Sequence, residues 1–165
     1  MSREPIKIRR ALVRDAAQVH AVMLAAKDDI PLRCPFEREE YKTTVRHYCR
    51  SGAAWVAEIG GKLAGVVVLD GTELFYLVTE AAFRRKGVGR ALVRRAEKIT
   101  KRRHGSGMTA EVWENNQPIA KLLLNEGFRL DPDNQAPERH ELLNLVKPKF
   151  VTYTLGTVPL ELRQI

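Results

Sequence analysis

Residues 74–90 read LFYLVTEAAFRRKGVGR, and this stretch decides the fold that the sequence predicts. Its first five residues are apolar or aromatic, as in a buried strand, and an amphipathic segment from Val88 to about Arg103 is typical of a helix. Between them, Gly87 and Gly89 let a ligand approach the backbone closely, because glycine has no Cβ. The free N–H groups and the positive dipole end of the helix point at the same place. The sequence therefore predicts an anion site between this strand and this helix.

Basic side chains surround the predicted anion site. Arg84, Arg85, Lys86 and Arg90 lie at the start of the helix, where each cation opposes the helix dipole by about 0.3–1 kcal/mol. A bound polyanion such as a pyrophosphate would offset this unfavourable arrangement. We therefore expect a ligand that carries a pyrophosphate.

Two common phosphate-binding motifs do not fit this loop. The dinucleotide-binding fingerprint needs a third glycine where this chain has Leu92. The phosphate-loop motif of NTPases needs Gly-Lys followed by Ser or Thr, which the sequence lacks. The pattern that remains, Arg-x-x-Gly-x-Gly between an apolar strand and an amphipathic helix, resembles motif A of the GNAT superfamily of acyl-CoA-dependent N-acyltransferases.

A second segment resembles motif B of the same superfamily. A predicted strand at residues 110–114 precedes Asn116, which begins a helix, and Gly127 and Phe128 follow the asparagine by eleven and twelve residues. Together the resemblance covers about residues 6–131. It implies an α/β (α+β) domain with a mixed, mostly antiparallel sheet, splayed fourth and fifth strands, and helices on both faces. It also implies that acyl-CoA lies in the gap between those two strands.

The hydrophobic periodicity predicts the elements of this domain along the chain. Turn residues between the second, third and fourth strands predict three consecutive antiparallel strands. At a length of 165 residues, we expect residues 1–165 to form a single domain. The predicted strands are residues 6–10, 53–59, 63–69, 74–78 and 110–114, with a closing strand at 150–155, and the predicted helices are residues 14–26, 37–50, 88–103 and 116–126, with a short helix at 138–146.

The composition limits the cellular compartments and the cofactors that we expect for this protein. The two cysteines, Cys34 and Cys49, lack metal-ligand spacing and are expected to be reduced thiols, which favours a cytoplasmic protein. No apolar stretch approaches the ~18 residues of a membrane span, so we expect no membrane partner. The four histidines lie in different predicted elements, so we expect no metal. Both a monomer and a homodimer fit the sequence.

Carried over residue by residue, the resemblance implies acetyl-CoA as cosubstrate. Backbone N–H groups of residues 86–90 would hold its pyrophosphate, and the backbone of Leu77 and Val78 would pair with its pantetheine arm. Asn116 would hydrogen-bond the same arm, and a plain helix N-cap is the alternative for this residue. The expected cofactor-binding residues are Leu77, Val78, Arg84, Arg85, Lys86, Gly87, Val88, Gly89, Arg90 and Asn116.

The catalytic residue that the resemblance implies is Glu73, which begins the motif strand eleven residues before Arg84. In several branches of the superfamily a glutamate on the fourth strand takes the proton of the attacking ammonium. A carboxylate near an apolar acyl site has a raised pKa, closer to the pH at which an amine must be deprotonated. The alternative is an ordinary exposed glutamate at a strand end, and Glu111, Glu114 and Glu80 are the other candidates for the base.

One position departs from the superfamily pattern. Members commonly have a tyrosine seven residues after the motif B asparagine, where its hydroxyl protonates the departing thiolate, but this chain has Leu123. Solvent or the ammonium of the substrate would then supply the proton, so we expect reduced and not abolished catalysis. Tyr76 and Tyr153 are candidate substitutes, and packing against the sheet is the alternative for both.

These patterns predict an N-acetyltransferase that moves an acetyl group from acetyl-CoA to an amine of a small molecule or protein by direct attack. Two other classes stay open. The missing tyrosine is compatible with a non-catalytic acyl-CoA sensor. The net charge of +8, with ten Lys or Arg against one Glu between residues 84 and 104, is compatible with a basic nucleic-acid-binding module. Because coenzyme A carries phosphates of its own, we do not expect nucleic acid as the main partner.

Overall fold

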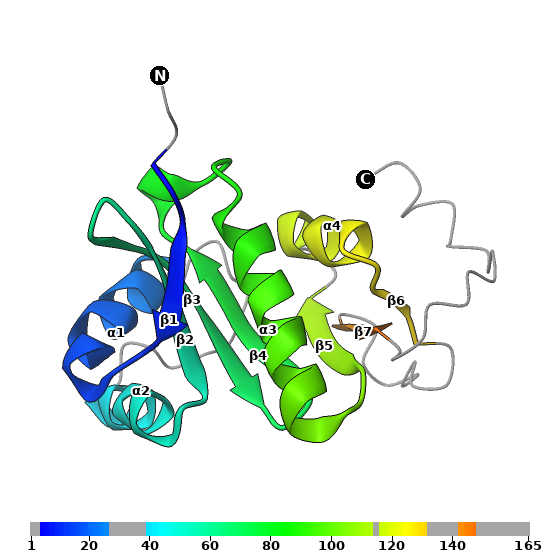
Figure 1. Cartoon of the computed structure of the whole chain (residues 1–165), viewed down its shortest axis with the longest axis horizontal. Helices are drawn as coiled ribbons and strands as arrows, with labels where there is room; N and C mark the ends of the chain where they lie inside the picture. The colour runs from blue at the N-terminus through cyan, green and yellow to red at the C-terminus, as the bar shows by residue number, and fades with distance from the viewer. Residues whose placement is uncertain (1–3, 27–38, 114–115, 132–141, 148–165) are drawn as a thin grey trace.

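The computed structural model describes residues 4–26, 39–113, 116–131 and 142–147 (Figure 1). Within them, seven strands form one sheet in the order β1-β2-β3-β4-β5-β7-β6. All neighbouring strands are antiparallel except β4 and β5, which are parallel. The strands are β1 (Lys7–Arg10), β2 (Ala54–Ile59), β3 (Lys62–Asp70), β4 (Glu73–Thr79), β5 (Met108–Trp113), β6 (Arg129–Leu130) and β7 (Leu142–Lys147).

Helices cover both faces of this sheet (Figure 1). One face carries α1 (Ala16–Ala25) and α2 (Glu39–Ser51), and the other carries α3 (Val88–His104) and α4 (Gln117–Asn125). Side chains alternate between the two faces of a strand. On β3, Val66 and Val68 therefore pack under α1 and α2, while Val67 and Leu69 pack under α3 and α4.

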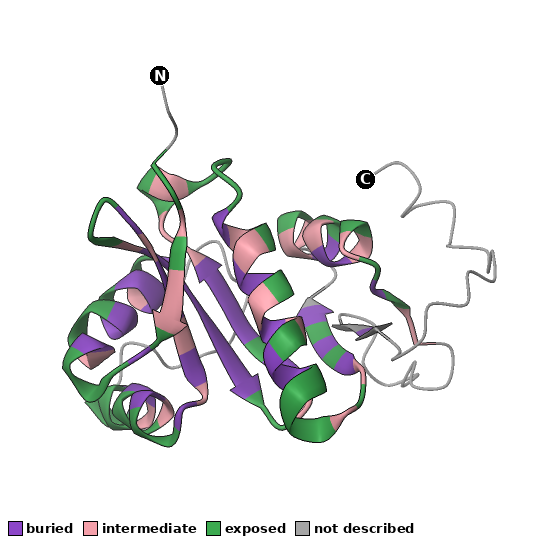
Figure 2. Cartoon of the chain, viewed as in Figure 1, coloured by how far each residue is buried: buried purple, intermediate pink, exposed green. Residues whose placement is uncertain are grey.

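Burial follows this layered arrangement. Figure 2 shows β3 and β4 buried along most of their length, and the outer sides of the helices exposed. Two short 3-10 helices, Val13–Asp15 and Ala81–Phe83, lead from β1 to α1 and from β4 toward α3. No helix in the described part of the chain combines the length and the apolar character needed to cross a membrane.

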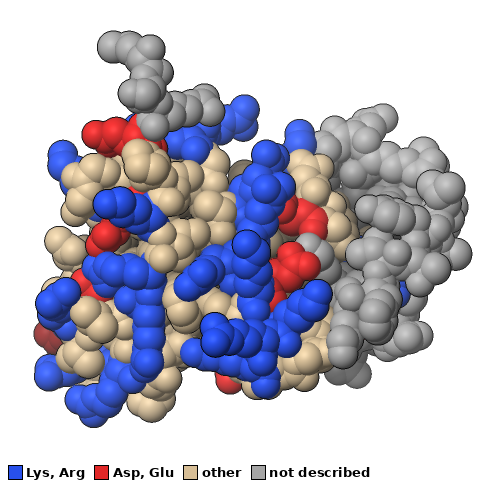
Figure 3. All heavy atoms as spheres, viewed as in Figure 1, with Lys and Arg blue, Asp and Glu red and all other residues tan. Residues whose placement is uncertain are grey.

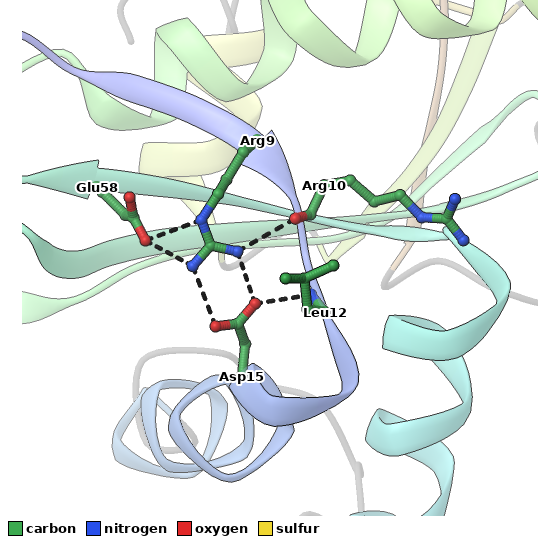
Figure 4. A network of polar contacts seen from close by, with 5 residues as sticks. All are labelled: Arg9, Arg10, Leu12, Asp15 and Glu58. Carbon is green, nitrogen blue, oxygen red and sulfur yellow. Dashed lines mark hydrogen bonds and ion pairs between the residues drawn. The ribbon is translucent and has the colours of Figure 1, made fainter.

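A network of ion pairs holds the edge strand β1 to the rest of the sheet (Figure 4). The Arg9 guanidinium donates through Nη1 and Nη2 to Asp15 at 2.6 and 3.0 Å, and through Nη2 and Nε to Glu58 at 2.6 and 3.0 Å. The Leu12 N–H also donates to the Asp15 carboxylate, at 2.7 Å. One cation thus joins β1, β2 and the entry to α1.

Most of the predicted architecture is confirmed. The mixed, mostly antiparallel sheet with helices on both faces is observed, and the predicted elements within residues 4–131 end within two residues of the observed ones. Sequence analysis does not predict β6, because two residues are too few to show an alternating pattern.

The predicted helix at residues 138–146 is wrong where the structure describes it. Residues 142–147 form β7, which pairs with β5 along its whole length, from Met108 opposite Lys147 to Trp113 opposite Leu142. A short apolar run such as LLNLV fits a helix or a strand, and pairing with a strand distant in sequence decides between them. Residues 138–141 and the predicted closing strand at 150–155 lie outside the described residues.

Candidate active site

The parallel strands β4 and β5 meet at one end and diverge at the other. Glu73, the first residue of β4, lies opposite Thr109 of β5, and the Thr109 N–H donates to the Thr72 carbonyl at 3.1 Å. Within the described residues, this is the one pair of residues in the β-ladder between the two strands. The splayed fourth and fifth strands that the resemblance implies are therefore observed.

A β-bulge in β4 accounts for this divergence. Val68 of β3 lies opposite Tyr76 and Leu69 lies opposite Leu74, so Phe75 is an extra residue on β4. A bulge bends its strand and increases the local twist, which turns the rest of β4 away from β5. The backbone edge of β4 beyond the bulge therefore faces the gap between the strands.

The loop after β4 has the backbone geometry of an anion site. Arg85 and Gly87 both have left-handed backbones, with φ of 63° and 87°. This region is uncommon for a residue other than glycine, and it is often found at functional sites. The first hydrogen bond of α3 is donated by the Ala91 N–H to the Gly87 carbonyl, at 3.0 Å. The N–H groups of residues 88–90 precede that bond and point out of the helix start, as the predicted pyrophosphate site requires.

Gly89 has a second, structural reason to be glycine. A Cβ added at this residue would lie 2.9 Å from Leu122 Cδ2 of α4 and 3.6 Å from Thr79 Oγ1 at the end of β4. A Cβ added at Gly87 would meet nothing within 4 Å, although its positive φ still favours glycine. The start of α3, the middle of α4 and the end of β4 therefore come together at Gly89.

Asn116 lies at the entrance of α4, as the sequence predicts. It occupies the N-cap position and is half-buried, but its side chain makes no capping hydrogen bond. An asparagine that acts only as an N-cap would accept such a bond from the first turn of the helix. The Asn116 side chain thus lies at the start of α4 without the hydrogen bond that the alternative interpretation requires.

The basic side chains around the loop have different surroundings. Arg84, Arg85 and Lys86 are exposed, and Lys86 Nζ lies 5.1 Å from the centre of the Phe83 ring. Figure 3 shows Lys and Arg side chains gathered along the face of the molecule that carries α3. Arg90 does not point toward the loop, because its Nε forms an ion pair with Glu126 at 2.9 Å.

Glu126 is a polar residue of this region that sequence analysis misses. It follows α4 directly, and its carboxylate pairs with Arg90 at 2.9 Å and with Arg94 at 2.8 Å. The side chain is only 6% exposed, whereas the two arginines are 56% and 62% exposed. The partners lie on another helix, so no local spacing in the sequence indicates the contact.

The candidate base Glu73 lies at the end of the gap where β4 and β5 meet. Burial raises the pKa of its carboxyl, and the nearby carboxylates of Glu111 and Asp70 raise the same pKa further. Glu111, an exposed residue, is thus a neighbour of Glu73. Glu80 lies beyond the other end of β4, where its Oε2 is buried with no hydrogen-bond partner among the described residues. Glu114 lies outside the described residues.

Core residues surround both the position of the usual proton donor, Leu123, and one of its candidate substitutes, Tyr76. Leu123 is 0% exposed and packs in the core between the sheet and α3. Tyr76 is 8% exposed, and its ring centre lies 6.5 Å from those of Tyr41 and Tyr48 on α2, as expected for an aromatic packed against the sheet. Tyr153 lies outside the described residues.

Two further predictions from the sequence concern cysteine and metal. Cys49 is a buried free thiol on α2, and burial raises its pKa to about 11. Cys34 lies outside the described residues. Among the residues that the structure describes, no group of three or more His, Cys, Asp or Glu side chains is arranged to hold a metal ion.

The family follows from comparison of the sequence with protein-family models. The model described as acetyltransferase (GNAT) family matches residues 20–128, which include both motifs. The chain belongs to the GNAT acetyltransferase family. The resemblance drawn from motifs A and B is confirmed. Comparison with curated protein sequences gives no significant match.

Solved structures agree with this family assignment. The apo form of YjaB from Escherichia coli is 26% identical with a TM-score of 0.58, over 86% of this chain and 97% of that one. The PaiA N-acetyltransferase of Thermoplasma acidophilum, solved in complex with coenzyme A, is 19% identical with a TM-score of 0.70, over 87% and 99%. Diaminobutyrate acetyltransferase EctA of Paenibacillus lautus, solved with its substrate and coenzyme A, is 16% identical with a TM-score of 0.65, over 90% and 98%. The last two share the fold of this GNAT chain.

Proposed function

We propose that this GNAT protein is an N-acetyltransferase, a single domain that moves the acetyl group of acetyl-CoA to an amine by direct attack. The observation that carries the proposal is the gap between β4 and β5, which leads to the glycine loop and the start of α3. An exposed strand edge and a set of free N–H groups suit the two parts of a coenzyme A molecule, its pantetheine arm and its pyrophosphate. A structural neighbour that was solved with coenzyme A supports the choice of ligand.

The cosubstrate is proposed to lie along β4. The N–H groups of residues 86–90 bind the pyrophosphate, with the exposed Arg84 and Arg85 side chains beside it. The backbone of Leu77 and Val78 pairs with the pantetheine arm, and the Asn116 amide binds the same arm from the other side of the gap. The seven residues of β4 span about 20 Å, so an arm that follows the strand from the loop places its thioester toward Glu73.

Glu73 is proposed as the general base. It takes a proton from the ammonium of the acceptor, and the neutral nitrogen attacks the thioester carbonyl to form the amide bond. The nitrogen then releases its surplus proton to solvent and the C–S bond breaks. Coenzyme A leaves as a thiolate that solvent protonates, since the usual tyrosine is replaced by the buried Leu123. The raised pKa of Glu73 supports this role, because a general base acts best when its pKa is close to the pH of the reaction.

Acetyl-CoA binding and thiol release test this function. A ligand at ~100 times its dissociation constant stabilises the folded state by about 2.7 kcal/mol, so acetyl-CoA should raise the melting temperature where adenosine does not. A screen of amines should then give release of the coenzyme A thiol with at least one acceptor. Binding without release for any amine would favour the acyl-CoA sensor. No binding of acetyl-CoA, together with salt-sensitive binding of DNA or RNA through the basic α3, would favour the nucleic-acid-binding module.

A further inference from the structure

The contact of Glu126 with two arginines runs against the local preferences of both helices. Acidic residues are unfavourable near a helix C-terminus and basic residues near an N-terminus, by about 0.3–1 kcal/mol each. Glu126 directly follows the last residue of α4, and Arg90 lies in the first turn of α3. Each residue is therefore misplaced in its own helix, and the ion pair between the helices offsets both conflicts.

Glu126 is the residue on which this contact depends. Its carboxylate uses both oxygens, Oε1 for Arg90 and Oε2 for Arg94, and it is almost fully buried beneath them. The two guanidinium groups keep more than half of their surface in solvent. Removal of the carboxylate would leave two solvated cations, whereas removal of the cations would leave a buried charge without a partner.

The contact joins the two helices that carry the proposed binding groups for acetyl-CoA. Arg90 is on the helix turn whose N–H groups are proposed to bind the pyrophosphate. Glu126 is ten residues from Asn116, about 15 Å along α4. Between them, Leu122 packs on Gly89. Two contacts, one apolar and one ionic, therefore fix how α4 lies against α3, and with it the position of Asn116 relative to the loop.

We propose that Glu126 is a positioning residue, whose carboxylate sets the spacing between the pyrophosphate-binding start of α3 and the pantetheine-binding Asn116. This inference rests on the proposed function, since both binding roles come from it. Glu126 touches neither group of the ligand itself. It acts through Arg90 and Arg94, and it keeps both guanidinium groups turned toward α4.

Two probes separate this role from a general effect on folding. ADP carries a pyrophosphate but no pantetheine arm, while acetyl-CoA needs both sites at the correct distance. In Glu126→Gln, the dissociation constant of acetyl-CoA measured by calorimetry should rise on the order of tenfold, because one of two linked contacts is lost. The affinity for ADP should stay the same or increase, because a negative charge is removed and two cations are released beside the loop.

A second variant and a matched control complete the experiment. Arg94→Gln removes one of the two ion pairs, and should raise the dissociation constant of acetyl-CoA by less than Glu126→Gln does. If Glu126→Gln does not fold, Arg94→Gln tests the positioning role in its place. Arg9→Gln breaks ion pairs on β1, and should lower the melting temperature without a change in either dissociation constant.

The outcomes are distinguishable. Equal weakening of ADP and acetyl-CoA in the Glu126 and Arg94 variants, or unchanged acetyl-CoA binding in both, would overturn the positioning role. Absence of acetyl-CoA binding by the wild-type protein would instead overturn the proposed function, on which the positioning role depends.

Discussion

The Asp15 carboxylate accepts hydrogen bonds from Arg9 and Leu12, whereas the charges near the Glu73 carboxylate include those of Glu111 and Asp70. Arg9 and the Leu12 N–H donate to Asp15 (Figure 4), and the Arg9 guanidinium holds the pKa of that carboxyl below its usual range. Burial and the neighbouring carboxylates move the pKa of Glu73 in the opposite direction. The charged form of a carboxyl group is thus stabilised at Asp15 and destabilised at Glu73.

This difference separates a structural site from a candidate catalytic one. The Arg9 network lies at the edge of the sheet, where the guanidinium pairs with the carboxylates of Asp15 and Glu58 and no step of a reaction is proposed. The region around Glu73 leaves like charges together at the meeting point of β4 and β5, which costs stability. Carboxyl groups with raised pKa values are frequent among catalytic bases, so the comparison predicts that changes at the two sites affect different properties.

The largest expected effect is on the rate of acetyl transfer after Glu73→Gln. Loss of a positioned base costs about 100- to 10,000-fold, or roughly 3–5 kcal/mol in the activation free energy. Part of the rate should return at high pH, where the amine arrives already neutral. The measurement is the pH–rate profile of both forms with one good amine. Wild-type rates for the variant across neutral pH would move the role of base to Glu111, Glu114 or Glu80, or to water.

The next effect in size is a loss of stability after Arg9→Met. Removal of one partner from a fully buried ion pair costs about 3–5 kcal/mol. The Arg9 side chain is 36% exposed, so we expect about 1–3 kcal/mol here. Urea unfolding measures this loss, and acetyl transfer below the melting transition should keep its wild-type rate. A variant as stable as the wild type would show that the network contributes nothing to the free energy of folding.

A smaller effect is the pH dependence of that stability difference. The folded-state pKa of Asp15 is lowered, so its contribution is fully present above the unfolded-state pKa of about 3.8 and is lost as the pH falls through the lower folded-state value. The free-energy difference between wild type and Arg9→Met should therefore stay constant from pH 7 to about pH 4 and shrink below it. A constant difference down to pH 3 would assign the loss to packing of the arginine side chain.

The smallest effect has the opposite sign and belongs to Glu73. Its folded-state pKa is raised, so the ionised form destabilises the protein above that pKa, and the cost disappears as the pH falls below about 4.5. Glu73→Gln should therefore melt at a slightly higher temperature than the wild type at pH 7, and at the same temperature near pH 4. A variant that is less stable at pH 7 would show that the carboxylate is paired and not repelled.

The sequence alone determined the parts of this protein that depend on short-range patterns. The glycine loop between an apolar strand and an amphipathic helix, and the asparagine eleven residues before Gly127, led to the family and to the candidate loop. Alternating and helical periodicities placed the elements from residue 6 to residue 126. These features are local, because backbone conformation and helix polarity depend on neighbours in the chain.

The tertiary structure decided what depends on contacts between distant segments. Pairing with β5 makes residues 142–147 a strand, although their apolar run also fits a helix. Packing against Leu122 gives Gly89 a structural role beside the proposed one in ligand access, and burial in the core makes Leu123 a packing residue. Glu126 pairs with Arg90 and Arg94 across two helices. The residues in each of these contacts are far apart in the sequence, and no local spacing specifies their partners. Only the fold brings them together.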